Sequence, residues 1–74
     1  MTPSKGTVLI TGASGMIGRL LTARLTARGY AVRWLVRNPS AAPVTAFRWL
    51  PEEGELDAAA FEGTDAIIHL AGEN

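Results

Sequence analysis

The chain has 74 residues, enough for one small domain at most, and 47% of them are hydrophobic, as in an ordinary globular protein. Seven basic residues balance seven acidic ones, so no bulk charge would draw the chain to nucleic acid or to an anionic membrane. The absence of cysteine excludes disulfides and thiolate metal sites and fits a reducing compartment. The early apolar run, residues 8–10, is too short for a signal peptide or a membrane span, and we therefore expect a cytoplasmic protein.

The first half of the chain has the pattern of a single strand–helix–strand unit. Residues 1–6 are polar and are expected to form a flexible end. Residues 7–11 are a short β-branched run, as expected of a buried strand, and residues 31–36 form a second apolar run. Between them, apolar residues recur at helical spacing over residues 17–25, and Gly29 is a suitable helix stop. This order predicts two parallel strands joined by a right-handed crossover.

The second half of the chain is less regular and predicts two further strands, at residues 44–50 and 65–70. The link between the second strand and the third, residues 38–43 after Arg37, is only six residues long, so a parallel third strand without its own helix is feasible but tight. Residues 57–61 are expected to form one or two helical turns. The predicted fold class is therefore α/β, with a parallel sheet of about four strands.

Gly12, Gly15 and Gly18 form a G-x-x-G-x-x-G motif where the first strand meets the helix. The first glycine would allow a sharp turn, the second a close approach of the backbone to a bound group, and the third close packing of helix on strand. The N–H groups of the first helical turn would then hold a pyrophosphate. In this context the motif predicts dinucleotide binding, although turn and packing needs alone are the competing explanation. A Walker A loop is excluded because no Lys-Ser or Lys-Thr pair follows.

The residue after the second strand bears on the choice between NADP and NAD. An acidic side chain there would bond the adenosine ribose and favour NAD, but no carboxylate occurs between Tyr30 and Asn38. Arg37 stands there instead, and its planar guanidinium suits the 2′-phosphate of NADP. We therefore expect NADP, with NAD as the alternative; an ordinary exposed arginine is the competing explanation. Ser14 could add a hydroxyl contact, whereas Arg33 is a weaker candidate because it lies in mid-strand.

Several segments resemble the start of an extended short-chain dehydrogenase/reductase, the superfamily of NAD-dependent epimerases and dehydratases that act on nucleotide sugars. These segments are TGASGMIG, LVRNP, FRWLPEEGELD and FEGTDAIIHLAGEN, and they agree in order and spacing over nearly the whole chain from Thr7 onward. They are most similar to an epimerase-like branch whose members are labelled cell-division inhibitor or sugar epimerase. The resemblance implies the N-terminal part of a doubly wound parallel (Rossmann) sheet in residues 7–74, a nicotinamide dinucleotide and a small-molecule substrate.

The resemblance also implies a cofactor site that combines the glycine loop with the ends of later strands. Many relatives have an aspartate after the third strand that bonds the adenine amino group, whereas this chain has Trp49, Leu50 and Pro51 there. Leu50 would approach the adenine, and Arg37 would hold the 2′-phosphate. The expected cofactor-binding residues are Gly12, Ser14, Gly15, Met16, Ile17, Gly18, Arg37, Leu50, Leu70, Ala71 and Gly72.

No catalytic residue and no metal site are predicted in this chain. The resemblance implies hydride transfer with a tyrosine as acid or base and a lysine four residues later. The single tyrosine, Tyr30, has Trp34 rather than a lysine at that spacing. His69 is expected to be a packed or hydrogen-bonded residue rather than a base. The acidic residues between Glu52 and Asp57 are expected to form a solvated turn rather than a metal site.

The chain ends at Asn74, directly after the fourth predicted strand, whereas a doubly wound domain needs further strands and helices. We interpret it as the N-terminal portion of a longer NAD(P)-dependent epimerase, dehydratase or reductase, inactive alone. The free edge of the last strand could pair with another copy. Two alternatives stay open: a non-catalytic NADP-sensing or regulatory protein of the same fold, and an isolated or designed half-domain.

Overall fold

The computed structural model describes residues 5–13 and 15–70 of the chain. The helix and strands of this part are β1 (Thr7–Thr11), α1 (Met16–Ala27), β2 (Ala31–Val36), β3 (Ala46–Leu50), β4 (Glu55–Leu56) and β5 (Ala66–His69). Short 3-10 helices in the connections are η1 (Pro39–Ala41), η2 (Pro51–Glu53) and η3 (Ala58–Phe61). Among the described residues, no helix is long and apolar enough to cross a membrane.

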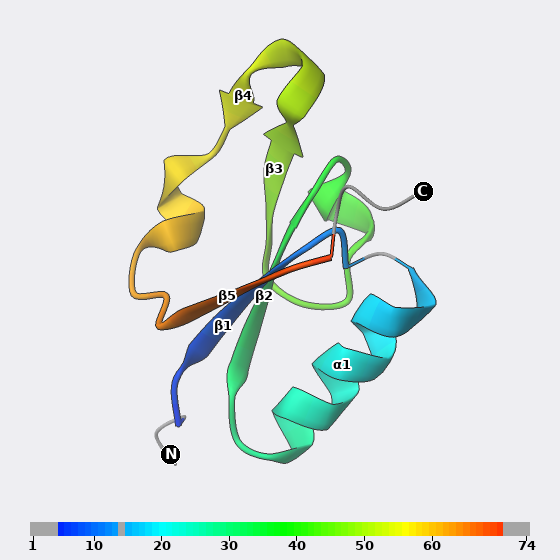
Figure 1. Cartoon of the computed structure of the whole chain (residues 1–74), viewed down its shortest axis with the longest axis vertical. Coiled ribbons are helices and arrows are strands. Elements are labelled where there is room, and N and C mark those ends of the chain that lie inside the picture. The colour runs from blue at the N-terminus through cyan, green and yellow to red at the C-terminus, as the bar shows by residue number, and fades with distance from the viewer. Residues whose placement is uncertain (1–4, 14, 71–74) are drawn as a thin grey trace.

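The strands form one sheet in the order β4-β3-β2-β1-β5 (Figure 1). β1 is parallel to β2 and to β5, and β2 is parallel to β3, as the α/β prediction requires. The connection from β2 to β3 contains only η1, so the tight parallel crossover is present. Because these strands are parallel, the carboxyl ends of β1, β2, β3 and β5 lie at the same end of the sheet.

Two strand predictions were too long, and one strand was not predicted. β3 begins at Ala46 rather than at residue 44, and β5 covers residues 66–69 rather than 65–70. The unpredicted strand β4 has two residues and pairs antiparallel with the end of β3, too short to produce a sequence pattern. It follows a turn at Gly54, where a φ of 68° favours glycine. The helical turn expected at residues 57–61 is confirmed as η3, capped by the side chain of Asp57.

Alternate side chains of the strands fill two separate clusters, one on each face of the sheet. On the face covered by α1, the cluster contains Val8, Ile10, Val32 and Trp34, with Trp34 only 1% exposed. On the other face, Leu9 and Leu35 form a cluster with Ala60 of η3, and two aromatic residues of β3 pack against it. Figure 1 shows α1 and the η3 segment on opposite sides of the sheet. The burial of β1 and β2 on both faces explains their apolar runs, which in β2 are interrupted by Arg33.

Candidate functional site

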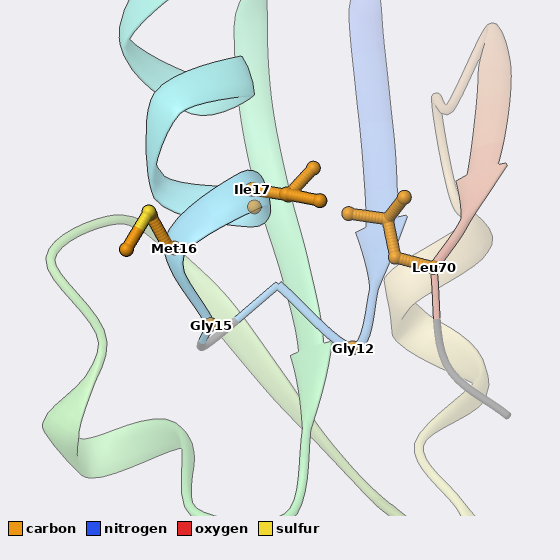
Figure 2. A pocket seen from close by; sticks show the side chains of 6 residues that line it. Gly12, Gly15, Met16, Ile17 and Leu70 are labelled. Carbon is orange, nitrogen blue, oxygen red and sulfur yellow. The ribbon is translucent and has the colours of Figure 1, made fainter. Parts of the chain in front are cut away.

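A pocket of about 500 Å³ lies at the carboxyl end of β1, where the chain enters α1 (Figure 2). Its lining residues are Gly12, Gly15, Met16, Ile17, Gly18 and Leu70. All six belong to the expected cofactor-binding set, and Leu70 joins them from the end of β5, far away in the sequence. Figure 2 shows the Ile17 and Leu70 side chains extending toward each other, whereas Met16 points away. The pocket therefore has apolar side chains beside a bare glycine backbone.

Gly12 turns the chain sharply away from the end of β1. Its φ of 68° lies in the left-handed region, which glycine adopts without steric cost. The turn is anchored on both sides, because the Gly12 N–H donates to the Leu35 carbonyl oxygen at 3.4 Å and the Leu70 N–H donates to the Thr11 carbonyl oxygen at 3.0 Å. The backbone conformation itself therefore favours glycine at position 12.

Gly18 brings α1 into close contact with the turn that precedes it. A Cβ atom at this position would lie 2.2 Å from the Ala13 carbonyl oxygen, and both residues are buried. Trp34 fixes the same turn of the helix from below: its Nε1 donates to Thr22 Oγ1 at 2.8 Å, and Thr22 Oγ1 donates to the Gly18 carbonyl oxygen at 2.7 Å. Close packing inside the protein therefore requires glycine at position 18.

Gly15 differs from both, because no described contact requires it to be glycine. Its φ of −82° and ψ of −176° are extended values that any residue adopts, and, its two chain neighbours aside, no described residue lies within 4 Å of the place that a Cβ atom would take. Gly15 is also the N-cap of the twelve-residue helix α1, with no side-chain capping bond and no acidic residue in the first turn. No side chain of the described residues caps the N–H groups of that turn, and backbone N–H groups at a helix N-terminus are donors suited to an anionic acceptor.

Arg37 and Leu50 do not line the pocket, but they lie at the same end of the sheet as the pocket, where the parallel strands finish. Arg37 directly follows β2, and both of its terminal nitrogens donate to the carboxylate of Glu52, one of them to Oε1 at 2.9 Å. This hydrogen-bonded pair raises the pKa of the Arg37 guanidinium and lowers the pKa of the Glu52 carboxyl, in each case through the hydrogen bond first. Leu50 is half-buried at the end of β3. Ser14, Ala71 and Gly72 lie outside the described residues.

The residues set aside as catalytic candidates, and the weaker cofactor candidate Arg33, occupy structural positions. Tyr30 precedes β2, at the opposite end of the sheet from the pocket, and packs against the cluster under α1. His69 is hydrogen-bonded as expected, with Nδ1 2.6 Å from Thr11 Oγ1. Arg33 donates to the carbonyl oxygen of Ala60 at 3.2 Å, away from the pocket. Among the described residues, no cluster of three or more His, Asp or Glu side chains is placed to hold a metal ion.

Sequence reasoning missed the ion pair between Arg37 and Glu52. The predicted topology already indicated that this pair could form, because parallel second and third strands have their carboxyl ends at the same end of the sheet. Arg37 follows the first of these strands, and Glu52 follows the second by two residues. Their pairing could have been proposed from that arrangement alone.

A parallel sheet whose first strand enters a helix through a glycine turn is a Rossmann-type α/β fold. The structure superimposes on the crystal structure of a proposed epimerase from Burkholderia cenocepacia J2315 with a TM-score of 0.72 and 30% sequence identity, covering 97% of this chain and 27% of that one. Residues 8–74 match the model of the NAD dependent epimerase/dehydratase family. The chain belongs to this family, as its resemblance to the extended short-chain dehydrogenases/reductases predicted, and membership implies a nicotinamide dinucleotide as cofactor.

Individual relatives agree with this assignment. An epimerase family protein of Mycobacterium leprae is 41% identical over 70 residues, which are 95% of this chain and 22% of the relative. A dihydroflavonol 4-reductase of Arabidopsis thaliana is 40% identical over a region that covers 96% of this chain and 22% of the relative. A human epimerase family protein is 40% identical over 67 residues, with coverage of 90% and 20%. The chain thus spans about a fifth of the length of these curated relatives.

Proposed function

We propose that this chain is the dinucleotide-binding portion of an NAD(P)-dependent epimerase, dehydratase or reductase, and that it holds the cofactor pyrophosphate at the N-terminus of α1. The observation that carries the proposal is the free space at Gly15. The protein itself accounts for glycine at positions 12 and 18, through a positive φ and through contact with Ala13. A pyrophosphate that rests on the backbone accounts for the remaining glycine.

The helix terminus has the electrostatics that such a ligand needs. The first-turn N–H groups of α1 have no capping side chain from Gly15, and the positive end of the helix dipole attracts an anion. Ile17 and Leu70 offer apolar contact to the less polar parts of a dinucleotide beside that terminus. We include Ser14, Ala71 and Gly72 in the proposed site on the strength of the family resemblance.

We further propose NADP as the preferred dinucleotide, with Arg37 as the ligand of its 2′-phosphate. Arg37 is exposed at the end of β2, and its two-pronged bond to a carboxylate indicates a guanidinium presented for planar recognition of an oxyanion. Leu50, which ends the adjacent β3, would contact the adenine. NAD, which lacks the 2′-phosphate, is the alternative. Arg37 would recognise the 2′-phosphate, whereas the other residues of the proposed site would contact groups that the two dinucleotides share.

The chemistry of the whole protein is hydride transfer at the nicotinamide ring that the bound dinucleotide supplies. The residues described here would bind that dinucleotide and orient it. Tyr30 lies at the opposite end of the sheet from the pocket, and the ring of His69 is hydrogen-bonded to Thr11. We therefore assign the acid–base step and substrate recognition to parts of the whole protein that this chain, about a fifth of the length of its relatives, does not cover.

Replacing Gly15 in the intact protein tests the pyrophosphate site. In Gly15→Asp, the new carboxylate would cap α1, so the free energy of unfolding should stay within about 1 kcal/mol of the wild type or rise. The same carboxylate would occupy the anion position and repel the pyrophosphate, so the Kd for both NADP and NAD should increase by about tenfold or more. Isothermal titration calorimetry measures the Kd, and chemical denaturation measures the unfolding free energy.

Gly15→Asn is the matched control, because asparagine caps a helix about as well as aspartate but carries no charge. It should weaken binding less than Gly15→Asp does, with similar stability. If a folded Gly15→Asp variant binds both dinucleotides as tightly as the wild type, the pyrophosphate does not lie at this helix terminus.

A further inference from the structure

The carboxylate that the sequence lacks at the end of β2 is supplied in space by Glu52. β2 and β3 are parallel neighbours, with Val36 opposite Arg48. The chain leaves β3 at Leu50 and turns through η2, which brings Glu52 beside Arg37. Arg37 therefore meets a partner fifteen residues further along the chain.

The geometry of this pair uses the donors that a phosphate would need. Arg37 Nη2 donates to Glu52 Oε1 at 2.9 Å, and Arg37 Nη1 donates to the other carboxylate oxygen. These two bonds occupy the end-on pair of N–H groups, from Nη1 and Nη2, which is one of the parallel pairs with which an arginine binds a carboxylate or a phosphate. A 2′-phosphate that takes both donors must first displace Glu52.

The charge of Glu52 acts in the same direction as its hydrogen bonds. A carboxylate beside Arg37 would lie close to the 2′-phosphate and repel it, whereas the uncharged 2′-hydroxyl of NAD would meet no such repulsion. The Arg37 and Glu52 side chains are 65% and 51% exposed, so both are hydrated and can separate without burying an unpaired charge. Exchange of partners at Arg37 is therefore feasible in the folded protein.

We propose that Glu52 is a specificity-determining residue that competes with the 2′-phosphate of NADP for Arg37 and so weakens the preference of the site for NADP over NAD. This inference rests on the proposed function, because it assumes a dinucleotide with its adenosine ribose at the end of β2. Glu52 would set the ratio of the two affinities without contacting the reacting atoms.

The test compares Glu52→Gln with Glu53→Gln in the intact protein, by titration calorimetry with NADP and with NAD. Both variants lose one negative charge, and Glu53 influences Arg37 through its charge alone in the described structure. Glu52→Gln should lower the Kd for NADP by about three- to tenfold and leave the Kd for NAD within about twofold, as expected for an exposed pair. Glu53→Gln should change the NADP-to-NAD ratio by less than half as much.

A second pair of variants asks whether Glu52 acts through Arg37. In an Arg37→Gln background, Glu52→Gln should improve NADP binding by less than it does in the wild type, because no guanidinium remains to be released. An equal improvement would mean repulsion alone and would overturn the competition.

The outcomes separate this inference from the proposal beneath it. An unchanged or lowered NADP preference in Glu52→Gln, or an equal rise in Glu53→Gln, would refute the role of Glu52 while leaving the dinucleotide site intact. Loss of NAD binding in Glu52→Gln would make Glu52 a ribose ligand and would also refute the competition. If the wild-type protein binds neither dinucleotide, the proposed function itself fails.

Discussion

At the scale of single residues, the glycines of one motif meet three different physical demands. Gly12 supplies a left-handed turn, Gly18 supplies contact between helix and loop, and Gly15 leaves space beside N–H groups that no side chain of the described residues caps. Substitutions at the three positions should therefore fail in different ways. Gly18 offers the clearest contrast with Gly15, because its neighbours are backbone atoms that cannot rotate aside.

Gly18→Ala should destabilise the intact protein by about 1–3 kcal/mol, the usual range for overpacking a buried contact. The added methyl group would lie 2.2 Å from the Ala13 carbonyl oxygen and 2.4 Å from its Cα atom, so α1 would have to move away. Gly15→Ala is the matched control and should cost clearly less, because no described atom lies within 4 Å of its Cβ. Urea denaturation measures both, and equal losses would contradict the packing role of Gly18.

The residue scale also shows what the sequence could and could not predict about the site. The glycine spacing located the pocket, because backbone conformation and close contact are local demands that select glycine directly. Leu70 reaches the pocket that Ile17 lines because β5 pairs with β1, and the family resemblance, rather than a local pattern, placed Leu70 in the expected site. Glu52 was read as part of a solvated turn, because its partner Arg37 becomes a neighbour through the fold rather than along the chain.

At the scale of elements, η3 depends on β2 for its place on the sheet. This 3-10 helix has four residues, too few to be stable alone, and its anchor is the fully buried Ala60. From β2, Arg33 binds the segment by donating to the carbonyl oxygens of Ala60 and Glu62 and to Thr64 Oγ1. An arginine in mid-strand thus acts as a clamp between β2 and a segment that follows β3.

Arg33→Met should release this clamp, because methionine keeps the aliphatic stem of arginine but removes its donors. The free energy of unfolding should fall by about 1–3 kcal/mol, the cost of losing hydrogen bonds from a charged donor at a partly buried site. Amide hydrogen exchange should accelerate in residues 58–64 more than in α1. Arg48→Met, at an exposed position of β3, is the control and should leave both quantities nearly unchanged. Uniform acceleration over the whole chain would contradict a local clamp.

The same scale explains which elements could be predicted from the sequence. β1, α1 and β2 have periodic apolar patterns because both faces of the sheet or one face of the helix are buried, and their bounds were close to those predicted. The third strand was predicted two residues too early, although the Thr45 carbonyl oxygen does accept a bond from the Trp34 N–H at 2.9 Å. β4 is a strand because its two residues pair with Trp49 and Leu50, and a two-residue segment is too short to predict such pairing from the sequence.

At the scale of the whole molecule, the sheet ends in two unequal edges. β4 closes one edge with two residues, which leaves little backbone for another strand to pair with. β5 forms the other edge and has four residues, paired on one side with β1 and with no described strand on the other. Ile67 of β5 is 53% exposed, so an apolar side chain stands beside the unpaired backbone groups. That combination favours pairing with a further strand.

The 74-residue chain studied alone should therefore self-associate through β5. Sedimentation velocity should show a weight-average mass that rises with concentration above the 7.8 kDa of one chain. Ile67→Lys should shift the molecules toward the monomer, because a charged edge residue opposes strand addition. Leu56→Lys, on the short edge strand β4 and 45% exposed in the wild type, is the matched control and should leave the association unchanged. A chain that stays monomeric at about 100 μM, where weak pairing would already be visible, would show that β5 does not recruit another strand.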